Sequence, residues 1–315
     1  MAMPGQQLKI AIAGAGGLGS LFGGRLFAHA QVTLIARGER LQTLREQGVV
    51  INVDGESDSC SPTVIDSENP DELAGLAEID YLLFACKTQH TEEFARLLAP
   101  YIGESTQIVS LQNGVDNEII LEEQFGRSII GAMTVRFGAH LSPNGQVDVV
   151  GELITRVGDY PTGVSPRLDP LVAALNRAGF AAAAVDDIRL ESWKKMVINC
   201  ACNPVSALQF GDIQTLYKTP SSRWVMQNMM REAAAAAAAD GVEIGPAELE
   251  QLSAALEAMP PLRSSMQVDA ERGTPLELGG LTGAIMRRAA ALGQEALVTS
   301  TVHNLLLSRY PNAAV

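Results

Sequence analysis

The stretch Gly14-Ala15-Gly16-Gly17-Leu18-Gly19 organises the first half of this chain. The apolar run at residues 8–13 is typical of a buried strand, and the apolar spacing of residues 20–27 predicts a helix. Strand, glycine turn and helix are the context in which G-x-G-x-x-G binds a dinucleotide. The first glycine permits the turn, the second lets the backbone approach a pyrophosphate, and the third lets helix and strand pack closely. We therefore expect a dinucleotide site here; the alternative is a glycine-rich turn without a ligand.

The residues after the second strand indicate which dinucleotide binds. NAD-binding units usually end this strand with an acid that accepts a hydrogen bond from the ribose 2′-hydroxyl. Here the apolar run at residues 31–36 is followed by Arg37, a cation that suits a 2′-phosphate, and Arg40 is placed to assist it. We therefore expect NADP(H) rather than NAD(H); the alternative for Arg37 is a solvated surface arginine.

The size and charge of the chain limit its classes of function. Its 315 residues suit two domains, and 47% hydrophobic against 19% charged residues suits a globular protein with a sizeable core. The net charge of −13, without a long basic face, argues against nucleic acid and anionic membranes as partners. Because we find neither a signal-peptide pattern nor a membrane-spanning apolar run, we expect a cytoplasmic protein without a membrane partner.

The spacing of cysteines and histidines gives no sign of a metal site. The cysteines form no paired C-x-x-C sets and are expected to be buried free thiols, and the histidines are scattered. These residues are Cys60, Cys86, Cys200, Cys202, His29, His90, His140 and His303.

Short apolar runs alternate with helical patterns to about residue 185, which predicts a parallel sheet with helices on both faces. Within this region, residues 131–137 and 145–150 are expected to be antiparallel strands, and 154–158 a separate strand. Only helical patterns follow residue 187. The predicted fold class is α/β: an N-terminal Rossmann-type doubly wound sheet in residues 1–186 plus a C-terminal all-helical domain in residues 187–315.

Two predicted strands end in polar residues, at the edge where such sheets bind ligands. Lys87 follows one strand and is expected to meet the cofactor, and Asn113 follows the next and is expected to bind substrate or the nicotinamide ribose. The alternatives are a surface lysine lying along the protein and a turn-forming Asn-Gly pair.

The chemistry becomes specific in the helix predicted at residues 188–202 and directly after it. Lys195, Asn199 and Asn203 are four residues apart and so lie on one helical face. A cation and two amides on one face suit a polar anion better than a core; the alternative is a solvated face. Lys194 falls off this face and is expected to be exposed.

Two further polar residues follow in the second half. Ser265 lies in the segment Arg263-Ser264-Ser265-Met266, where a helix cap is the alternative role. Glu277 follows Pro275 and is expected in the first turn of a helix at residues 276–292, where the helix dipole would explain an acid.

Together these motifs resemble the ketopantoate reductase (2-dehydropantoate 2-reductase) family over nearly the whole chain. The glycine motif is common to many folds, whereas the ordered combination of the lysine–asparagine helix with the Ser-Ser-Met segment is specific. The parts are Gly14 to Gly19, Lys87, Gln112-Asn113-Gly114, Trp193-x-Lys195 with Asn199 and Asn203-Pro204, Ser264-Ser265-Met266-x-x-Asp269, and Glu277 after Thr274-Pro275.

The resemblance implies NADPH-dependent reduction of 2-dehydropantoate to (R)-pantoate, in the pathway to pantothenate and coenzyme A. It implies that Lys195 is the proton donor and that Glu277 is an active-site acid that contacts the cofactor. It also implies a cofactor-lining role for Ala139. The substrate-binding positions that it implies are Asn113, Asn199, Asn203 and Ser265.

The sequence departs from the family pattern at two places. Leu262 stands where members usually carry an Asn, and Phe210 lies in a segment where another Asn is expected. Losing two amides would make the pocket more apolar, so one alternative is a reductase of a different, more apolar 2-oxo acid. The others are a 3-hydroxyacid or opine-type dehydrogenase and a non-catalytic NADPH-binding sensor. The apolar helical domain also suits a homodimer.

Overall fold

The structure is a computed structural model that describes residues 7–311. Contacts within the chain divide it into two units. The first unit contains the described residues up to Gln112 and the segment Asn117–Ile188. The second contains the described residues from Arg189 onward and, in addition, the short piece Asn113–Asp116. A piece of chain that interrupts the first unit in sequence therefore groups with the second.

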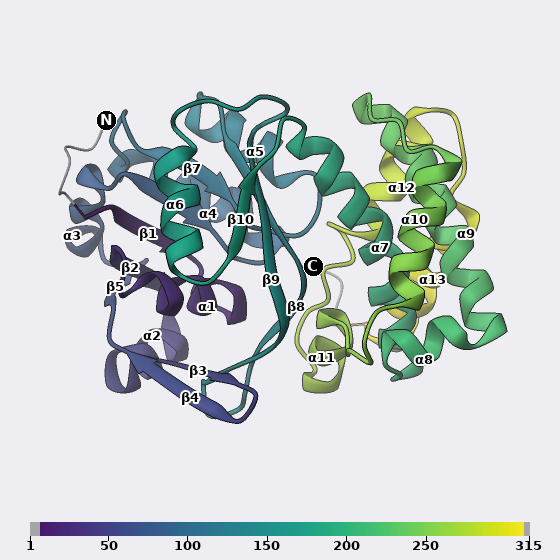
Figure 1. Cartoon of the computed structure of the whole chain (residues 1–315), viewed down its shortest axis with the longest axis horizontal. Helices are drawn as coiled ribbons and strands as arrows, with labels where there is room; N and C mark the ends of the chain where they lie inside the picture. Colours follow the sequence, from purple (N-terminus) through teal and green to yellow (C-terminus); the bar gives the residue numbers. More distant parts are fainter. Residues whose placement is uncertain (1–6, 312–315) are drawn as a thin grey trace. The chain divides into compact units, whose positions relative to one another are not determined.

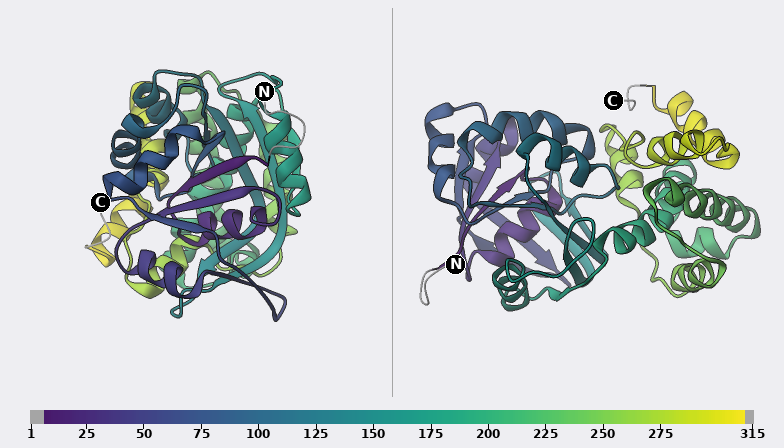
Figure 2. Two further views of the ribbon diagram at one scale, coloured as in Figure 1. Left: turned by 90° about the vertical axis from the view of Figure 1, so that its left-hand side faces the viewer. Right: turned by 90° about the horizontal axis from the view of Figure 1, so that it is seen from above.

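The strands described in the first unit join in one sheet (Figures 1 and 2). They are β1 (Lys9–Ala13), β2 (Gln31–Ala36), β3 (Val49–Val53), β4 (Glu56–Cys60), β5 (Thr63–Asp66), β6 (Tyr81–Phe84), β7 (Gln107–Ser110), β8 (Ile130–Leu141), β9 (Val147–Asp159) and β10 (Ala181–Ala184). Their order is β4-β3-β9-β8-β7-β6-β1-β2-β5, with β10 beside β9.

The strands β7, β6, β1, β2 and β5 are parallel neighbours in that order. From β1 the chain builds outward through β2 to β5, then returns to add β6 and β7 on the other side of β1. The direction of winding therefore reverses between β1 and β6. In doubly wound sheets, ligands bind at the carboxyl ends of the two strands that flank this reversal.

Both faces of the sheet are buried, as the apolar runs predict. Ile10 and Ile12 enter one core cluster, whereas Ala11 and Ala13, which point to the opposite face, enter another. Helices α1 (Gly17–Leu26), α2 (Gly38–Gln47) and α6 (Asp169–Arg177) contribute to the first cluster. Helices α3 (Pro70–Leu73), η1 (Ala74–Glu78), α4 (Thr91–Leu98) and α5 (Asn117–Phe125) contribute to the second. Two short 3₁₀ turns, η2 (Thr88–His90) and η3 (Ala99–Tyr101), flank α4.

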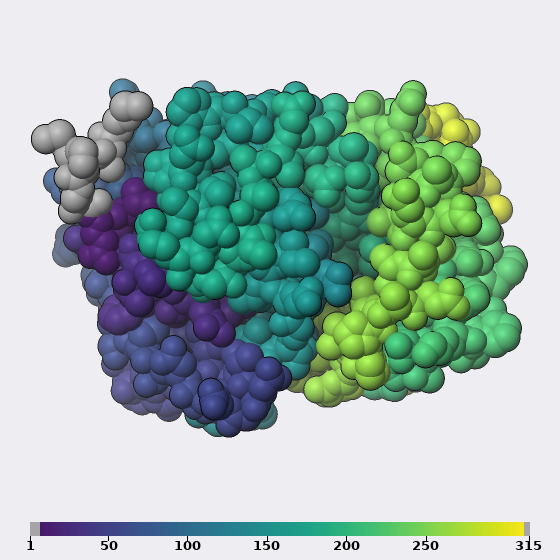
Figure 3. All heavy atoms as spheres, in the orientation of Figure 1, coloured from purple at the N-terminus to yellow at the C-terminus, as the bar shows by residue number. Residues whose placement is uncertain are grey.

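The second unit is built of helices around one apolar core. They are α7 (Ile188–Gln209), α8 (Ile213–Lys218), α9 (Pro220–Ala236), η4 (Ala237–Asp240), α10 (Pro246–Glu257), α11 (Ser265–Arg272), α12 (Thr282–Ala291) and α13 (Leu297–Arg309). The segment from α10 to α11 runs along the face of this unit seen in Figure 3. Ala233, Ala236 and Ala237 are fully buried, so the alanine-rich run packs tightly in this core. Among the described residues, no helix combines the length and apolar character that a membrane span requires.

The predicted fold class is confirmed, and the differences lie in individual elements. Strand β4 was not expected, because its sequence ESDSC is polar and mostly exposed at the sheet edge. The strands expected at 145–150 and 154–158 are one continuous strand, β9. Helices α5 and α8 were also not expected.

Two helix boundaries in the second unit differ from the prediction. Helix α7 continues through Pro204 instead of ending at residue 202. A proline removes one hydrogen bond from a helix, but Cys202, Pro204 and Val205 are all buried, and this packing outweighs the loss. Helix α12 begins at Thr282, so Glu277 lies in the turn before a helix and not in its first turn.

Candidate active site

The glycine turn follows β1 at the point where the sheet reverses its direction of winding. Gly14 has a φ of +99°, which favours glycine, and a Cβ there would lie 2.7 Å from the backbone nitrogen of Cys86. A Cβ on Gly19 would lie 1.9 Å from the carbonyl oxygen of Gly14. Both glycines are therefore required by the protein itself: the first for the turn and the third for the contact between helix and turn.

Gly16 is different, because the protein gives no steric reason for a glycine there. Its φ is −70°, and no described heavy atom lies within 4 Å of the place that a Cβ would take. Gly16 is also the residue directly before α1, where backbone N–H groups point outward and carry partial positive charge. An open backbone at a helix N-terminus fits a pyrophosphate.

Ala139, predicted to line the cofactor site, lies beside this turn. A Cβ on Gly17 would be 2.4 Å from the carbonyl oxygen of Ala139, so β8 approaches the turn as closely as a glycine allows. The structure therefore brings Ala139 together with the glycine motif, although more than a hundred residues separate them in sequence.

Arg40 holds the glycine turn in place, a role that the sequence did not suggest. Its Nε donates to the carbonyl oxygen of Ala15, its Nη2 to Ser20 Oγ and its Nη1 to the carbonyl oxygen of Gly145, each at 2.8 Å. Ser20 Oγ also donates to Ala15. Burial lowers the pKa of Arg40 below its ordinary value. The expectation that Arg40 assists Arg37 is wrong, because all three of its nitrogens bond to the turn and its neighbours.

Arg37 follows β2 and lies at the surface, with 38% of its side chain exposed. Its Nη1 donates to Glu93 Oε1 at 2.8 Å, and its guanidinium lies 5.6 Å from the Phe94 ring centre. The hydrogen bond to Glu93 raises the pKa of Arg37 above its ordinary value. Its Nε and Nη2 make no hydrogen bond with described residues, so two donors remain for a phosphate.

Lys87 lies at the carboxyl end of the neighbouring strand, β6. It is the residue directly before the 3₁₀ turn η2, and it follows Cys86, which the glycine turn approaches. Gln112 Nε2 donates to the carbonyl oxygen of Cys86 at 2.9 Å, which ties the ends of β6 and β7 together. The predicted cofactor residues of the first unit therefore gather at the carboxyl ends of β1, β2 and β6.

In the second unit, α7 carries Lys195, Asn199 and Asn203 along one face, as their spacing predicts. Lys195 and Asn199 are half-buried, and Asn203 is only 6% exposed. The side chains of Asn199 and Asn203 make no hydrogen bond with any described residue. A polar ligand on this face would supply the hydrogen bonds that these two amides do not make within the described protein. This face is therefore suited to a polar ligand.

The hydroxyl of Ser265, like the amides of Asn199 and Asn203, can contact a ligand, because a different residue caps its helix. Ser264 Oγ accepts from the backbone N–H of Gln267 at 3.1 Å and also contacts Ser206 Oγ. Ser264 is thus the N-cap of α11, and the hydroxyl of Ser265 makes no hydrogen bond with the described residues. The alternative cap role for Ser265 is excluded by this arrangement.

Lys194 does not stand exposed as expected. Its Nζ lies 2.8 Å from Glu191 Oε1, and about a third of each side chain is exposed. Lys194 therefore lies beside Glu191 of its own helix, and Lys195 lies on the face of Asn199.

The two departures from the family pattern, Phe210 and Leu262, differ in their surroundings. Phe210 is 42% exposed, has a φ of +54° just after α7, and lies 5.0 Å from the Arg309 guanidinium. It therefore ends a helix at the surface of its unit. Leu262 is half-buried, and its carbonyl oxygen accepts from the backbone N–H of Ile213 at 2.9 Å.

Comparison with known families gives this arrangement its context. The family description "Ketopantoate reductase PanE/ApbA" matches residues 10–162, and its C-terminal counterpart matches residues 187–309. The chain belongs to the ketopantoate reductase family. The resemblance stated from the motifs is thereby confirmed.

Relatives of known name agree with this assignment. The 2-dehydropantoate 2-reductase of Archaeoglobus fulgidus is 31% identical over 299 residues, which cover 95% of this chain and 96% of the relative. The crystal structure of 2-dehydropantoate 2-reductase from Methylococcus capsulatus is similar at a TM-score of 0.84, with 26% identity and 98% of each chain covered. A D-mandelate dehydrogenase solved with NADH shares the fold, at a TM-score of 0.87 and 23% identity, with 98% of this chain and all of that chain covered.

Membership in the ketopantoate reductase family confirms that the chain is an oxidoreductase acting on CH–OH groups. The family depends on NADPH, in agreement with the NADP(H) expected from Arg37. Among residues 7–311 no group of three or more His, Cys, Asp or Glu side chains is arranged to hold a metal ion.

Proposed function

We propose that this chain reduces 2-dehydropantoate to (R)-pantoate with NADPH, a step towards pantothenate and coenzyme A. The observation that carries this proposal is the face of α7, where Lys195 lies in line with two amides that no described residue satisfies. In this proposal, residues 1–186 bind the cofactor and residues 187–315 bind the substrate and perform the proton chemistry.

The first unit fits the cofactor at three points. The backbone around Gly16 is open and adjoins a helix N-terminus, which suits the pyrophosphate. The free donors of Arg37 suit the 2′-phosphate, while Lys87 and Ala139 lie at or beside the same strand ends. NADPH, when bound, supplies the hydride that reduces the C2 carbonyl.

The residues of the second unit then have distinct roles. Negative charge develops on the carbonyl oxygen of the substrate, and Lys195 Nζ stabilises it and donates the proton. Asn199, Asn203 and Ser265 bind the hydroxyl and carboxylate of the substrate through the donors and acceptors that the protein leaves unsatisfied. Glu277 orients Lys195 or contacts the nicotinamide ribose.

Asn113 joins these proposed substrate-binding residues, although it precedes residue 187 in the sequence. It groups with the second unit, and its amide binds substrate or the nicotinamide ribose. Its place in that unit favours a role beside Lys195.

A second candidate function is reduction of a more apolar 2-oxo acid. The presence of Leu262 where the family usually has Asn favours it, because one hydrogen bond to a polar substrate is lost.

The two candidates are separated by the ratio of kcat/KM values for different 2-oxo acids with NADPH. We expect 2-dehydropantoate to exceed pyruvate and branched 2-oxo acids that lack its hydroxyl by about 10²-fold or more, because sites built to bind a hydroxyl reject analogues without it. A higher kcat/KM for an apolar branched 2-oxo acid would instead assign the second function. NADPH binding without turnover of any 2-oxo acid would contradict both.

The cofactor preference has its own test at Arg37. In Arg37→Ala, KM for NADPH is expected to rise about 10- to 100-fold, the effect of losing a hydrogen bond to a charged group, whereas KM for NADH stays unchanged. Steady-state kinetics with each cofactor measure this. Arg45→Ala, another surface arginine paired with an acid, is the control. An equal rise for both cofactors would contradict a 2′-phosphate contact.

A further inference from the structure

The loop that carries Asn113 is fixed at both of its ends by one threonine. Gln112 Nε2 donates to Thr91 Oγ1 at 2.7 Å, and Thr91 Oγ1 donates to Asn117 Oδ1 at 2.8 Å. Gln112 and Asn117 belong to the first unit, as does Thr91. The residues between them, Asn113–Asp116, group with the second unit. Asn113 is therefore on a short loop whose middle is held by a different set of contacts from its ends.

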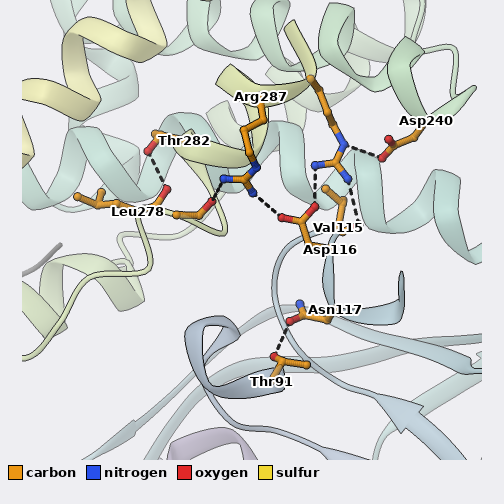
Figure 4. A network of polar contacts seen from close by, with 10 residues as sticks. Thr91, Val115, Asp116, Asn117, Asp240, Leu278, Thr282 and Arg287 are labelled. Carbon is orange, nitrogen blue, oxygen red and sulfur yellow. Dashed lines mark hydrogen bonds and ion pairs between the residues drawn. The ribbon is translucent and has the colours of Figure 1, made fainter. Parts of the chain in front are cut away.

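Those contacts come from two adjacent arginines of α12. Asp116 accepts from Arg287 Nη2 through Oδ2 and from Arg288 Nη1 through Oδ1, each at 2.7 Å (Figure 4). Val115, the preceding residue, is 4% exposed and lies in the apolar core of the second unit. The loop is thus anchored by one buried apolar side chain and one carboxylate shared between two guanidinium groups.

Arg288 also reaches the helix of Lys195. Its Nε donates to Asp240 Oδ2 at 2.8 Å, and Trp193 Nε1 donates to the same oxygen at 3.1 Å. The Arg288 guanidinium lies 5.4 Å from the Trp193 ring centre. Trp193 is two residues before Lys195 on α7 and is fully buried. One guanidinium therefore contacts both the loop of Asn113 and the helix segment of Lys195.

The two arginines differ sharply in their surroundings. Arg288 is 9% exposed as a residue, whereas 59% of the Arg287 side chain is exposed. Burial disfavours the charge of Arg288, but Asp116 and Asp240 outweigh it and raise its pKa above the ordinary value. A planar guanidinium presents its donors in fixed, diverging directions and so holds two carboxylates on different segments in one geometry, whereas a lysine presents its three donors from a single point.

We propose that Arg288 is a positioning residue that sets Asn113 against the Lys195 segment of α7 by holding Asp116 and Asp240 together. This inference rests on the proposed function, because it assumes that Asn113 and Lys195 act on the same substrate. Apolar packing could replace a buried ion pair without loss of stability; the ion pair adds a defined geometry between the two segments.

The test compares Arg288→Lys with Arg287→Lys, a matched change at the neighbouring position. We expect R288K to lower kcat/KM for 2-dehydropantoate about 10²-fold, the effect of a small misplacement of a binding group, with the Kd of NADPH unchanged. R287K is expected to change kcat/KM by at most about fivefold, as for an exposed ion pair. Thermal unfolding of both variants reports how much of each is folded, and Asp116→Asn serves in the same assays should R288K not fold.

A double-mutant cycle with Asn113→Ala separates two effects of R288K: misplacement of Asn113 and a general disturbance of the fold. If Arg288 acts through Asn113, the N113A change costs much less in the R288K background than in the wild type. The proposal is overturned if the two effects multiply, or if R288K and R287K behave alike. If the wild-type protein reduces no 2-oxo acid, the proposed function fails and this inference fails with it. If the wild-type protein is active but the two substitutions act independently, only this inference fails.

Discussion

Replacing Lys195 by alanine is expected to lower kcat for 2-dehydropantoate about 10²- to 10⁴-fold, the contribution of a well-placed general acid. The Kd of NADPH should not change, because the residues that fit its pyrophosphate and 2′-phosphate lie in the first unit, whereas Lys195 lies on α7. Single-turnover oxidation of bound NADPH, combined with fluorescence titration of NADPH, measures the two quantities separately.

Lys194→Ala provides the matched control, because it removes the same kind of side chain one position away. Lys194 pairs with Glu191 at 2.8 Å on a part of α7 away from the amides. A surface pair of this kind contributes about 0–1 kcal/mol, so K194A should retain nearly all activity and stability. Equal activity in K195A and K194A would remove Lys195 from the mechanism.

The second large effect is expected at the glycine turn, where two alanine substitutions should impair the protein for different reasons. One is expected to weaken NADPH binding and the other to lower the stability of the fold. Gly16→Ala leaves the fold unstrained, because Gly16 has an ordinary φ and no described atom near the new methyl group. The methyl group would occupy the approach of the pyrophosphate, and we expect the Kd of NADPH to rise about tenfold or more, equivalent to about 1.4 kcal/mol. Thermal unfolding without cofactor should match the wild type.

Gly19→Ala is the contrasting variant. Its methyl group would lie 1.9 Å from the carbonyl oxygen of Gly14, so helix and turn must separate. Overpacking of this kind destabilises a protein by about 1–3 kcal/mol, and we expect a lower melting temperature even without NADPH. A G16A protein that binds NADPH normally would contradict the pyrophosphate assignment, whatever G19A does.

The sequence predicts best the features that depend on neighbouring residues. The turn at Gly14, the strand pattern of β1 and the shared face of Lys195, Asn199 and Asn203 all follow from spacing within a few residues. The reason is that backbone conformation and helical periodicity are local properties. The family resemblance extended these local patterns to the whole chain.

Features that depend on long-range packing were missed. Arg40 bonds to Gly145, 105 residues away, and Arg288 bonds to Asp116, 172 residues away, and no local pattern reveals either pair. The continuation of α7 through Pro204 was missed for the same reason, because core packing and not propensity keeps it helical. Strand β4 was not predicted, because its polar sequence lacks the apolar pattern of a buried strand.

At Ser265 the structure decided between roles that the sequence left open. Ser264 caps α11, which leaves the hydroxyl of Ser265 for a ligand. Phe210 ends α7 and packs against Arg309. In both cases the neighbour is a side chain whose position only the folded chain specifies.

The central claim is tested most directly by following NADPH oxidation and product formation together, with purified protein and 2-dehydropantoate. The account predicts that NADPH consumed equals (R)-pantoate formed, and that K195A abolishes both while still binding NADPH. No (R)-pantoate, or equal turnover by the K195A variant, would contradict it.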